Sequence, residues 1–104
     1  MEQTEEIHDI EWNGILIRIT YDPDWMNGSK DGVSMAHLQI KSLKPEYAPL
    51  PITETGYLSH FTPPQLIEAA GGPVSGVIEQ LDLRAESDDW KNFVEATRQL
   101  DLFA

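Results

Sequence analysis

The segment Thr53–His60 gathers the side chains of this chain that could carry acid–base or nucleophilic chemistry. Four residues there supply a carboxylate, a phenol, a hydroxyl and an imidazole: Glu54, Tyr57, Ser59 and His60. Ser59 and His60 are adjacent, but a nucleophile needs a base brought from elsewhere in the fold and an acid that orients this base. A polar loop beside a sheet often forms a pocket. The segment therefore predicts a small pocket, which is catalytic only if Glu54, Tyr57 and His60 converge in a cleft.

The alternative interpretation of this segment is structural. The rings of Tyr57 and Phe61 would anchor the loop, while the Thr and Ser hydroxyls would satisfy turns. No metal site or cofactor is predicted, because the chain has no cysteine and its three histidines, His8, His37 and His60, match no short ligand motif. The glycine pair at 71–72 lacks the spacing of a phosphate-binding loop and indicates a helix end.

The charge of the chain restricts its partners. Eighteen acidic residues against seven basic ones give a net charge of −11. Direct binding to nucleic acid or to an anionic membrane surface is disfavoured, because either needs a basic face. A basic protein partner would instead be attracted at low salt. One hypothesis is therefore an acidic mimic of nucleic acid that inhibits a host defence protein, carried by the acidic segments 1–11 and 79–101.

The elements that must position these residues begin with a hairpin over residues 7–21. Asn13-Gly14 lies between two alternating apolar runs and predicts a two-residue type I′ turn. This loop length pairs Trp12 with Ile15, Ile10 with Ile17 and His8 with Ile19 on one side of the sheet. It pairs Asp9 with Arg18 on the other side, where an opposite-charge pair is expected on a wet face.

A polar loop over residues 22–32 precedes a third strand over 33–43, in which Ala36, Leu38 and Ile40 share one face. This strand is expected antiparallel beside the hairpin. A short fourth strand is expected around Ile52–Thr55.

Helix signals fill the second half of the chain. Thr62 is expected to cap a first helix, Pro73 to open a second with a stripe at Val74, Val77, Ile78 and Leu81, and Ser87 to cap a third. Trp90, Phe93, Val94 and Thr97 would form the inner face of the third helix. The predicted fold class is α+β: a small antiparallel sheet of three to four strands with three helices packed on one face.

The length of 104 residues predicts one domain over 1–104. The chain has no run of 18 apolar residues, so no membrane span is predicted. The acidic start is unlike a secretory signal, so we expect a cytoplasmic protein. The sequence leaves its oligomeric state undetermined.

The last residues, Gln99–Ala104 (QLDLFA), raise a separate question. Leu100 and Leu102 are two residues apart, which suits an extended chain rather than one helix face. The third helix is therefore expected to fray near Arg98–Gln99. Residues 99–104 would then form an exposed docking tail, unless Leu102 and Phe103 fold back onto the core of their own domain.

The stretch QLDLF resembles the short motif by which bacterial replication and repair proteins dock on the DNA sliding clamp. The resemblance covers five residues and holds at each of them: Gln99, Leu100, Asp101, Leu102 and Phe103. It implies that Gln99 supplies an amide to a small subsite, that Leu100 bridges, that Asp101 faces solvent, and that Leu102 and Phe103 fill an apolar pocket. The expected function is a protein-binding module rather than an enzyme.

The chain as a whole resembles small uncharacterised proteins of proteobacterial plasmids and genomic islands. The stretch LPITETGYLSHF ahead of a short helix carries this likeness, together with the QLDLF end. It implies an accessory role in a mobile element.

Overall fold

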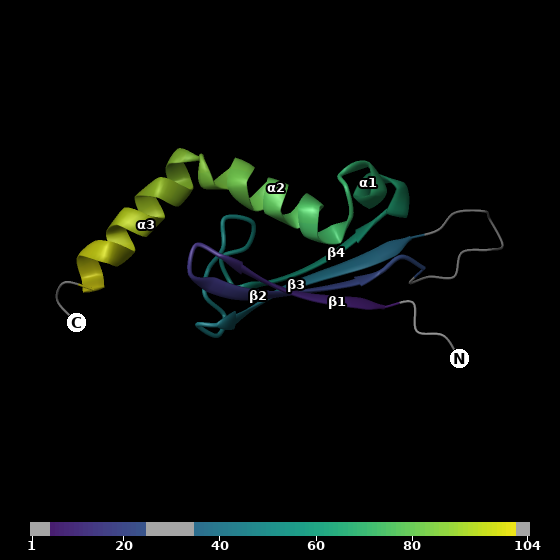
Figure 1. Ribbon diagram of the computed structural model, residues 1–104. Helices are drawn as coiled ribbons and strands as arrows, with labels where there is room; N and C mark the ends of the chain where they lie inside the picture. The colour runs from purple at the N-terminus through teal and green to yellow at the C-terminus, as the bar shows by residue number, and fades with distance from the viewer. Residues whose placement is uncertain (1–4, 25–34, 102–104) are drawn as a thin grey trace.

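A computed structural model describes residues 5–24 and 35–101 of the chain. Four strands form one antiparallel sheet in the order of the sequence, and three helices follow them (Figure 1). The strands are β1 (Glu6–Trp12), β2 (Ile15–Asp22), β3 (Ala36–Lys44) and β4 (Tyr57–Thr62). The helices are α1 (Pro64–Ala69), α2 (Pro73–Ala85) and α3 (Asp88–Asp101). The predicted α+β class is confirmed.

The first hairpin has the register that its turn predicts. Asn13 and Gly14 both have positive φ angles, of 47° and 80°, as a type I′ turn requires. Trp12 lies opposite Ile15, Ile10 opposite Ile17, and His8 opposite Ile19. On the other face the Arg18 guanidinium donates two hydrogen bonds to the Asp9 carboxylate, at 2.8 and 3.0 Å.

The third strand is confirmed, but the fourth was predicted in the wrong place. Leu50 and Thr53 form only an isolated bridge, and β4 begins at Tyr57. Gly56 explains this start: it has a φ of 73°, and a Cβ there would lie 2.5 Å from the Tyr47 carbonyl carbon. The chain can turn this tightly against its own backbone only with glycine. Of the loop expected over 22–32, residues 25–32 lie outside the described part of the chain.

The first helix also begins later than expected. Thr62 ends β4 and is buried instead of capping a helix, and α1 starts at Pro64 with no side-chain cap. A proline at the first helical positions needs no N–H partner, so the pair Pro63-Pro64 can start the helix directly. Pro73 opens α2 as predicted, and Val77 and Leu81 from its apolar stripe are buried.

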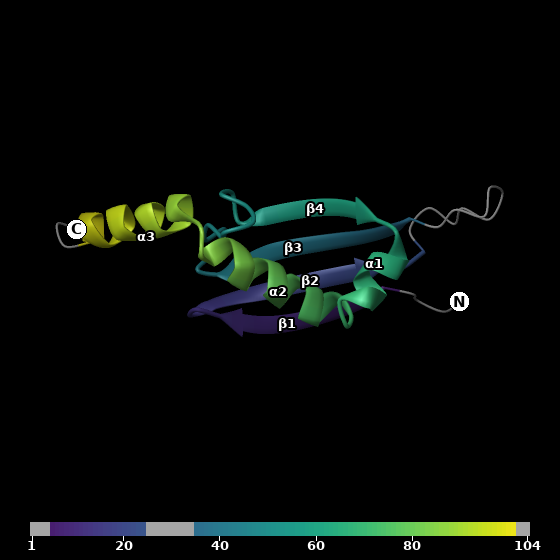
Figure 2. The same cartoon turned by 90° about the horizontal axis from the view of Figure 1, so that it is seen from above.

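The core lies between the sheet and α2. Ile17, Ile19 and Leu81 are fully buried, and Leu38 and Ile40 lie beside them. Figure 2 shows α2 crossing the sheet obliquely, so that its first turns lie over β1 and β2 and β4 is left to one side. The opposite face of the sheet has no described helix over it.

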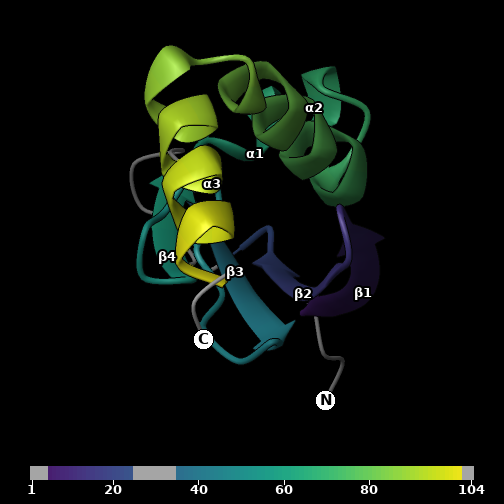
Figure 3. The ribbon, with the colours of Figure 1, turned by 90° about the vertical axis from the view of Figure 1, so that its left-hand side faces the viewer.

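The third helix is arranged differently from the expectation. Only its first turn packs on the core, through Trp90. The rest projects past the end of the sheet (Figure 1), so that α3 lies nearest to the viewer in the end-on view of Figure 3. Its predicted inner-face residues Phe93 and Val94 are 42% and 36% exposed, and Thr97 is exposed. The sheet is too short to cover the whole apolar stripe of α3, so the described part of the chain covers Phe93 and Val94 only partly.

Candidate functional site

The four polar residues predicted to form a pocket do not meet in one place. Tyr57 and Ser59 point to the open face of the sheet, because side chains alternate along β4, whereas Leu58 and His60 point towards the helices. Glu54 lines a different hollow, beside Leu50 and Trp90. Glu54, Tyr57 and His60 therefore do not converge, as an enzymatic site would require.

Part of the structural interpretation of the segment is confirmed. The hydroxyls of Thr53 and Thr55 both donate to the Tyr57 carbonyl, at 2.9 and 3.1 Å, and so close the turn that leads into β4. The two rings that were expected to anchor the loop are instead 41% exposed at Tyr57 and 46% exposed at Phe61.

The structure brings together one pair that sequence reasoning missed. His37 Nε2 lies 2.7 Å from Ser59 Oγ, a distance at which an imidazole could accept a hydroxyl proton. The imidazole of His37 is buried and stacks on Phe61, with ring centroids 4.4 Å apart. This bond is better explained as satisfying a buried polar ring, because the three hollows around α1, α2 and α3 are lined by other residues.

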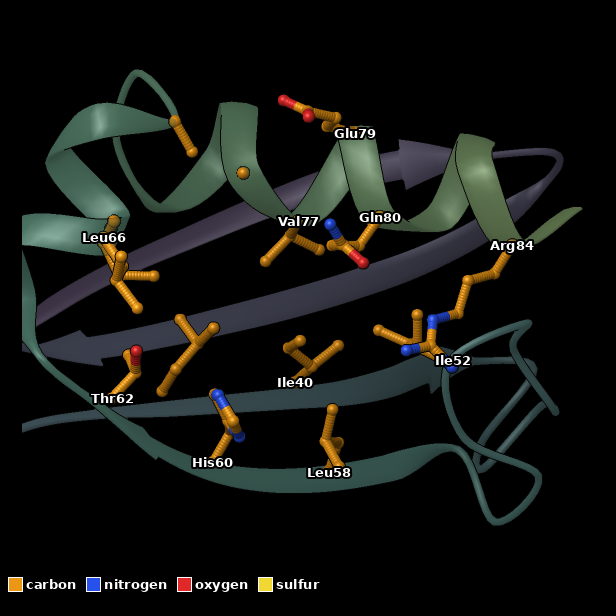
Figure 4. Close-up of a pocket in the computed structure, with 14 residues that line it drawn as sticks. Ile40, Ile52, Leu58, His60, Thr62, Leu66, Val77, Glu79, Gln80 and Arg84 are labelled. Carbon is orange, nitrogen blue, oxygen red and sulfur yellow. The ribbon is translucent and has the colours of Figure 1, made fainter.

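An apolar groove lies between β4 and the helices (Figure 4). Its volume is about 450 Å³, and its floor is formed by Ile40 and Leu58. Leu66 of α1 borders it and is 62% exposed. His60 rises into it from β4, while Gln80 and Arg84 reach towards it from α2, so the rim can form hydrogen bonds.

The joint between the sheet and α3 is held by two tryptophans. The indole N–H of Trp12 donates to Asp82 of α2 at 2.9 Å. The Trp12 ring packs against Trp90, with centroids 6.5 Å apart. Ser87 caps α3 as predicted, its hydroxyl oxygen accepting from the Trp90 N–H at 3.1 Å.

Past this joint α3 has few contacts with the rest of the domain. Phe93 stacks on Trp90 at 5.4 Å, which is a contact within the helix itself. The Thr97 hydroxyl donates to the carbonyl of Phe93 at 3.0 Å, again within the helix. Phe93 and Val94 still line the hollows on either side of Trp90, and beyond Val94 the helix continues as an arm.

The helix does not fray where it was expected to. Its backbone is helical through Gln99 and Leu100 as far as Asp101. Leu102 and Phe103 lie outside the described residues, as do the side chains from residue 98 onward. About two turns of helix, residues 91–98, therefore lie between Trp90 and the QLDLF stretch, and residues 99–101 of that stretch are themselves helical.

The carboxylates of the two acidic segments are exposed wherever they are described. Those of β1 and the residue before it are Glu5, Glu6, Asp9 and Glu11, and those of α2, α3 and their junction are Glu79, Asp82, Glu86, Asp88, Asp89 and Glu95.

The hydrogen bond from Arg18, helped by the positive charge of its guanidinium, lowers the pKa of Asp9 below its ordinary value of 3.8.

The part of the chain that the structure describes offers neither a candidate metal centre nor a candidate membrane span. No cluster of three or more metal-binding side chains occurs within residues 5–24 and 35–101. In the same ranges, no helix combines the length and the apolar character needed to cross a membrane.

Comparison with known proteins identifies one family. A protein-family model described as the KlcB third domain matches residues 5–90, well over half of the chain. No curated protein and no solved structure matches the chain. The matched region ends at Trp90, the last residue of α3 that packs on the core. The chain belongs to the KlcB third-domain family, a family associated with plasmids.

Proposed function

We propose that this protein is an accessory protein-binding module that docks on the replication sliding clamp through Gln99–Phe103. In this proposal the Gln99 amide hydrogen-bonds in a small subsite, and Leu100 bridges to the main pocket. Asp101 faces solvent, while Leu102 and Phe103 fill the apolar pocket. The assignment of each role rests on the resemblance of QLDLF to the clamp-binding motif.

The observation that carries the proposal is that α3 leaves the core after Trp90. The family match and the packed core end at the same residue, so residues 91–101 extend beyond both. A partner could approach this arm without competing with the sheet or with α2. The membership of a plasmid-associated family is consistent with an accessory protein that acts where DNA is replicated.

Docking in an extended conformation would require the end of α3 to unwind. Residues 99–101 are helical in the free chain, whereas the clamp motif is expected to bind as an extended strand. The last carbonyls of a helix have no intrahelical partner, and terminal turns open at little cost in free energy. The proposal therefore includes a local helix-to-strand transition on binding.

The energetics are consistent with a tethering contact. Burying Leu102 and Phe103 would contribute roughly 1.5–3 kcal/mol each. Ordering the segment and losing overall freedom would oppose this by several kcal/mol. A micromolar dissociation constant is the expected result.

The proposal is tested by titrating purified clamp with the full chain in a calorimeter. We expect micromolar binding by the unchanged chain, and no measurable binding after the double substitution Leu102→Ala and Phe103→Ala. A matched control is Asp101→Ser, which keeps the motif because that position accepts either residue. It should bind like the unchanged chain.

A further variant tests whether binding depends on the order of the residues in the motif or only on its amino-acid composition. Exchanging two residues, Gln99→Asp with Asp101→Gln, keeps the charge and the amino acids of the segment but moves the amide out of place. Loss of binding in this variant supports the proposed role of Gln99. Absence of binding by the unchanged chain, or equal binding by all four proteins, would overturn the proposal.

A further inference from the structure

The two edge strands of the sheet differ in how they meet solvent. The described sheet has β1 at one edge and β4 at the other. An edge strand offers backbone N–H and C=O groups to another chain, and proteins usually guard such edges with charges. The β1 strand carries Glu6, Asp9 and Glu11 within seven residues, whereas β4 has no charged residue in its six.

Both faces of β4 also carry exposed apolar surface. On the open face, Tyr57 and Phe61 are 41% and 46% exposed. On the other face, Leu58 lies in the apolar groove beside Leu66, which is 62% exposed. A strand laid along β4 would therefore gain apolar contacts above and below the new backbone ladder.

We propose that a second copy of this chain occupies this edge, with the two β4 strands antiparallel across a two-fold axis at Ser59. In this register Tyr57 of each copy lies opposite Phe61 of the other, so two aromatic cross-strand pairs form on the open face. On the groove face, Leu58 lies opposite the His60 of the second copy. The two four-stranded sheets become one sheet of eight strands, and each remaining edge is a charged β1.

The sequence of β4 favours a second copy over an unrelated peptide. Read outward from Ser59, the strand has an aromatic residue two positions away on either side, which is the self-complementarity that a two-fold axis requires. Its lack of charge matters because the whole molecule carries −11. Two copies would repel each other at most surfaces, and joining the uncharged edges keeps the carboxylates of the two β1 strands at the far edges of the combined sheet.

The register places position 59 of both copies side by side, and this allows a decisive test. Sedimentation of the full chain from micromolar to millimolar concentration should give a mass that rises from one copy to two. A lysine introduced by Ser59→Lys meets the same lysine across the axis, and Ser59→Glu likewise places two carboxylates together. Each variant alone should weaken the dimer by about tenfold or more, because like charges directly opposite are destabilising.

Mixing the two variants should restore the dimer as a heterodimer, since lysine then faces glutamate. Both substitutions remove the hydrogen bond to His37, so circular dichroism must establish that each variant is folded. If either is not, Tyr57→Lys serves in its place, because this half-exposed ring can be lost without emptying the core. It should weaken the dimer by removing both aromatic pairs.

The matched control is Ile7→Lys on β1, which changes an exposed apolar residue at the opposite edge. It should leave the dimer unchanged. The proposal is overturned if the unchanged chain stays monomeric at millimolar concentration. It is also overturned if the folded lysine and glutamate variants stay monomeric when mixed, or if Ile7→Lys disrupts the dimer as strongly as Ser59→Lys does.

Discussion

Trp12 connects three elements at the residue scale. It ends β1, its ring packs on Trp90 of α3, and its indole N–H donates to Asp82 of α2. We expect Asp82→Ala to lower the free energy of unfolding by about 1–3 kcal/mol, because the donor of a buried ring loses its partner. Urea denaturation followed by tryptophan fluorescence measures this change.

The control for this prediction is Asp82→Asn, which keeps an acceptor oxygen at the same place. It should cost less than the alanine variant. Equal losses in the two variants would mean that the hydrogen bond contributes little and that Asp82 acts through its charge.

The Asp9–Arg18 pair predicts a pH dependence at the same scale. Because the folded pKa of Asp9 is lowered from 3.8, its contribution to stability is complete above that value and is lost as the pH falls through the folded pKa. We expect the difference in stability between the unchanged chain and Arg18→Gln to be constant near pH 7 and to vanish in acid. Urea denaturation across this range measures it.

Both groups of this pair are exposed, so added salt should shrink the difference at pH 7. A difference that grows as the pH falls would contradict the assignment.

Which residue contacts were predictable depends on how far apart the partners lie in the sequence. The Asp9–Arg18 pair followed from a two-residue turn, because that turn sets the register without reference to the rest of the chain. The His37–Ser59 bond joins strands separated by a long loop, and no local pattern indicates their register. The predicted pocket failed for a different reason: the alternation of β4 divides Tyr57 and Ser59 from His60, and Glu54 precedes the strand and lines another hollow.

Among the elements, α3 was predicted correctly at its start and incorrectly in its packing. Ser87 caps it, as the residue type indicates, because capping is a local interaction. Its amphipathic stripe indicated a covered face, but the sheet extends only far enough to cover the first turn. Periodicity specifies which face of a helix is apolar and leaves open whether anything lies against it. The predicted fray at Arg98–Gln99 was wrong because helical backbone continues to Asp101.

This arrangement predicts that the cost of truncation falls steeply along α3. Trp90→Ala should lower the free energy of unfolding by about 2 kcal/mol, less than for a fully buried ring. Phe93→Ala should cost about 0.5–1 kcal/mol, through its stack on Trp90. Thr97→Ala should be close to neutral, within about 0.5 kcal/mol. Chemical denaturation of the three variants provides the comparison.

A loss at Phe93 or Thr97 as large as that at Trp90 would contradict this account of α3. It would mean that the helix packs on a surface along its whole length in solution.

At the scale of the whole molecule, the chain divides at Trp90. Residues up to this point match the KlcB third-domain family and contain the core, while the remainder of α3 projects from it. The proposed clamp contact uses the projecting part, and the proposed dimer uses the opposite side of the sheet from β1. The two proposals involve different residues, 99–103 and 57–61, so a side-chain substitution that removes one interaction should leave the other intact.

Hydrogen–deuterium exchange of the full chain, with and without purified clamp, shows whether the end of α3 is the segment that docks. We expect the clamp to slow exchange in peptides that span residues 95–104 and to leave the exchange of residues 5–90 unchanged. Protection confined to the sheet or to α2, or no protection at residues 95–104 at saturating clamp, would contradict it.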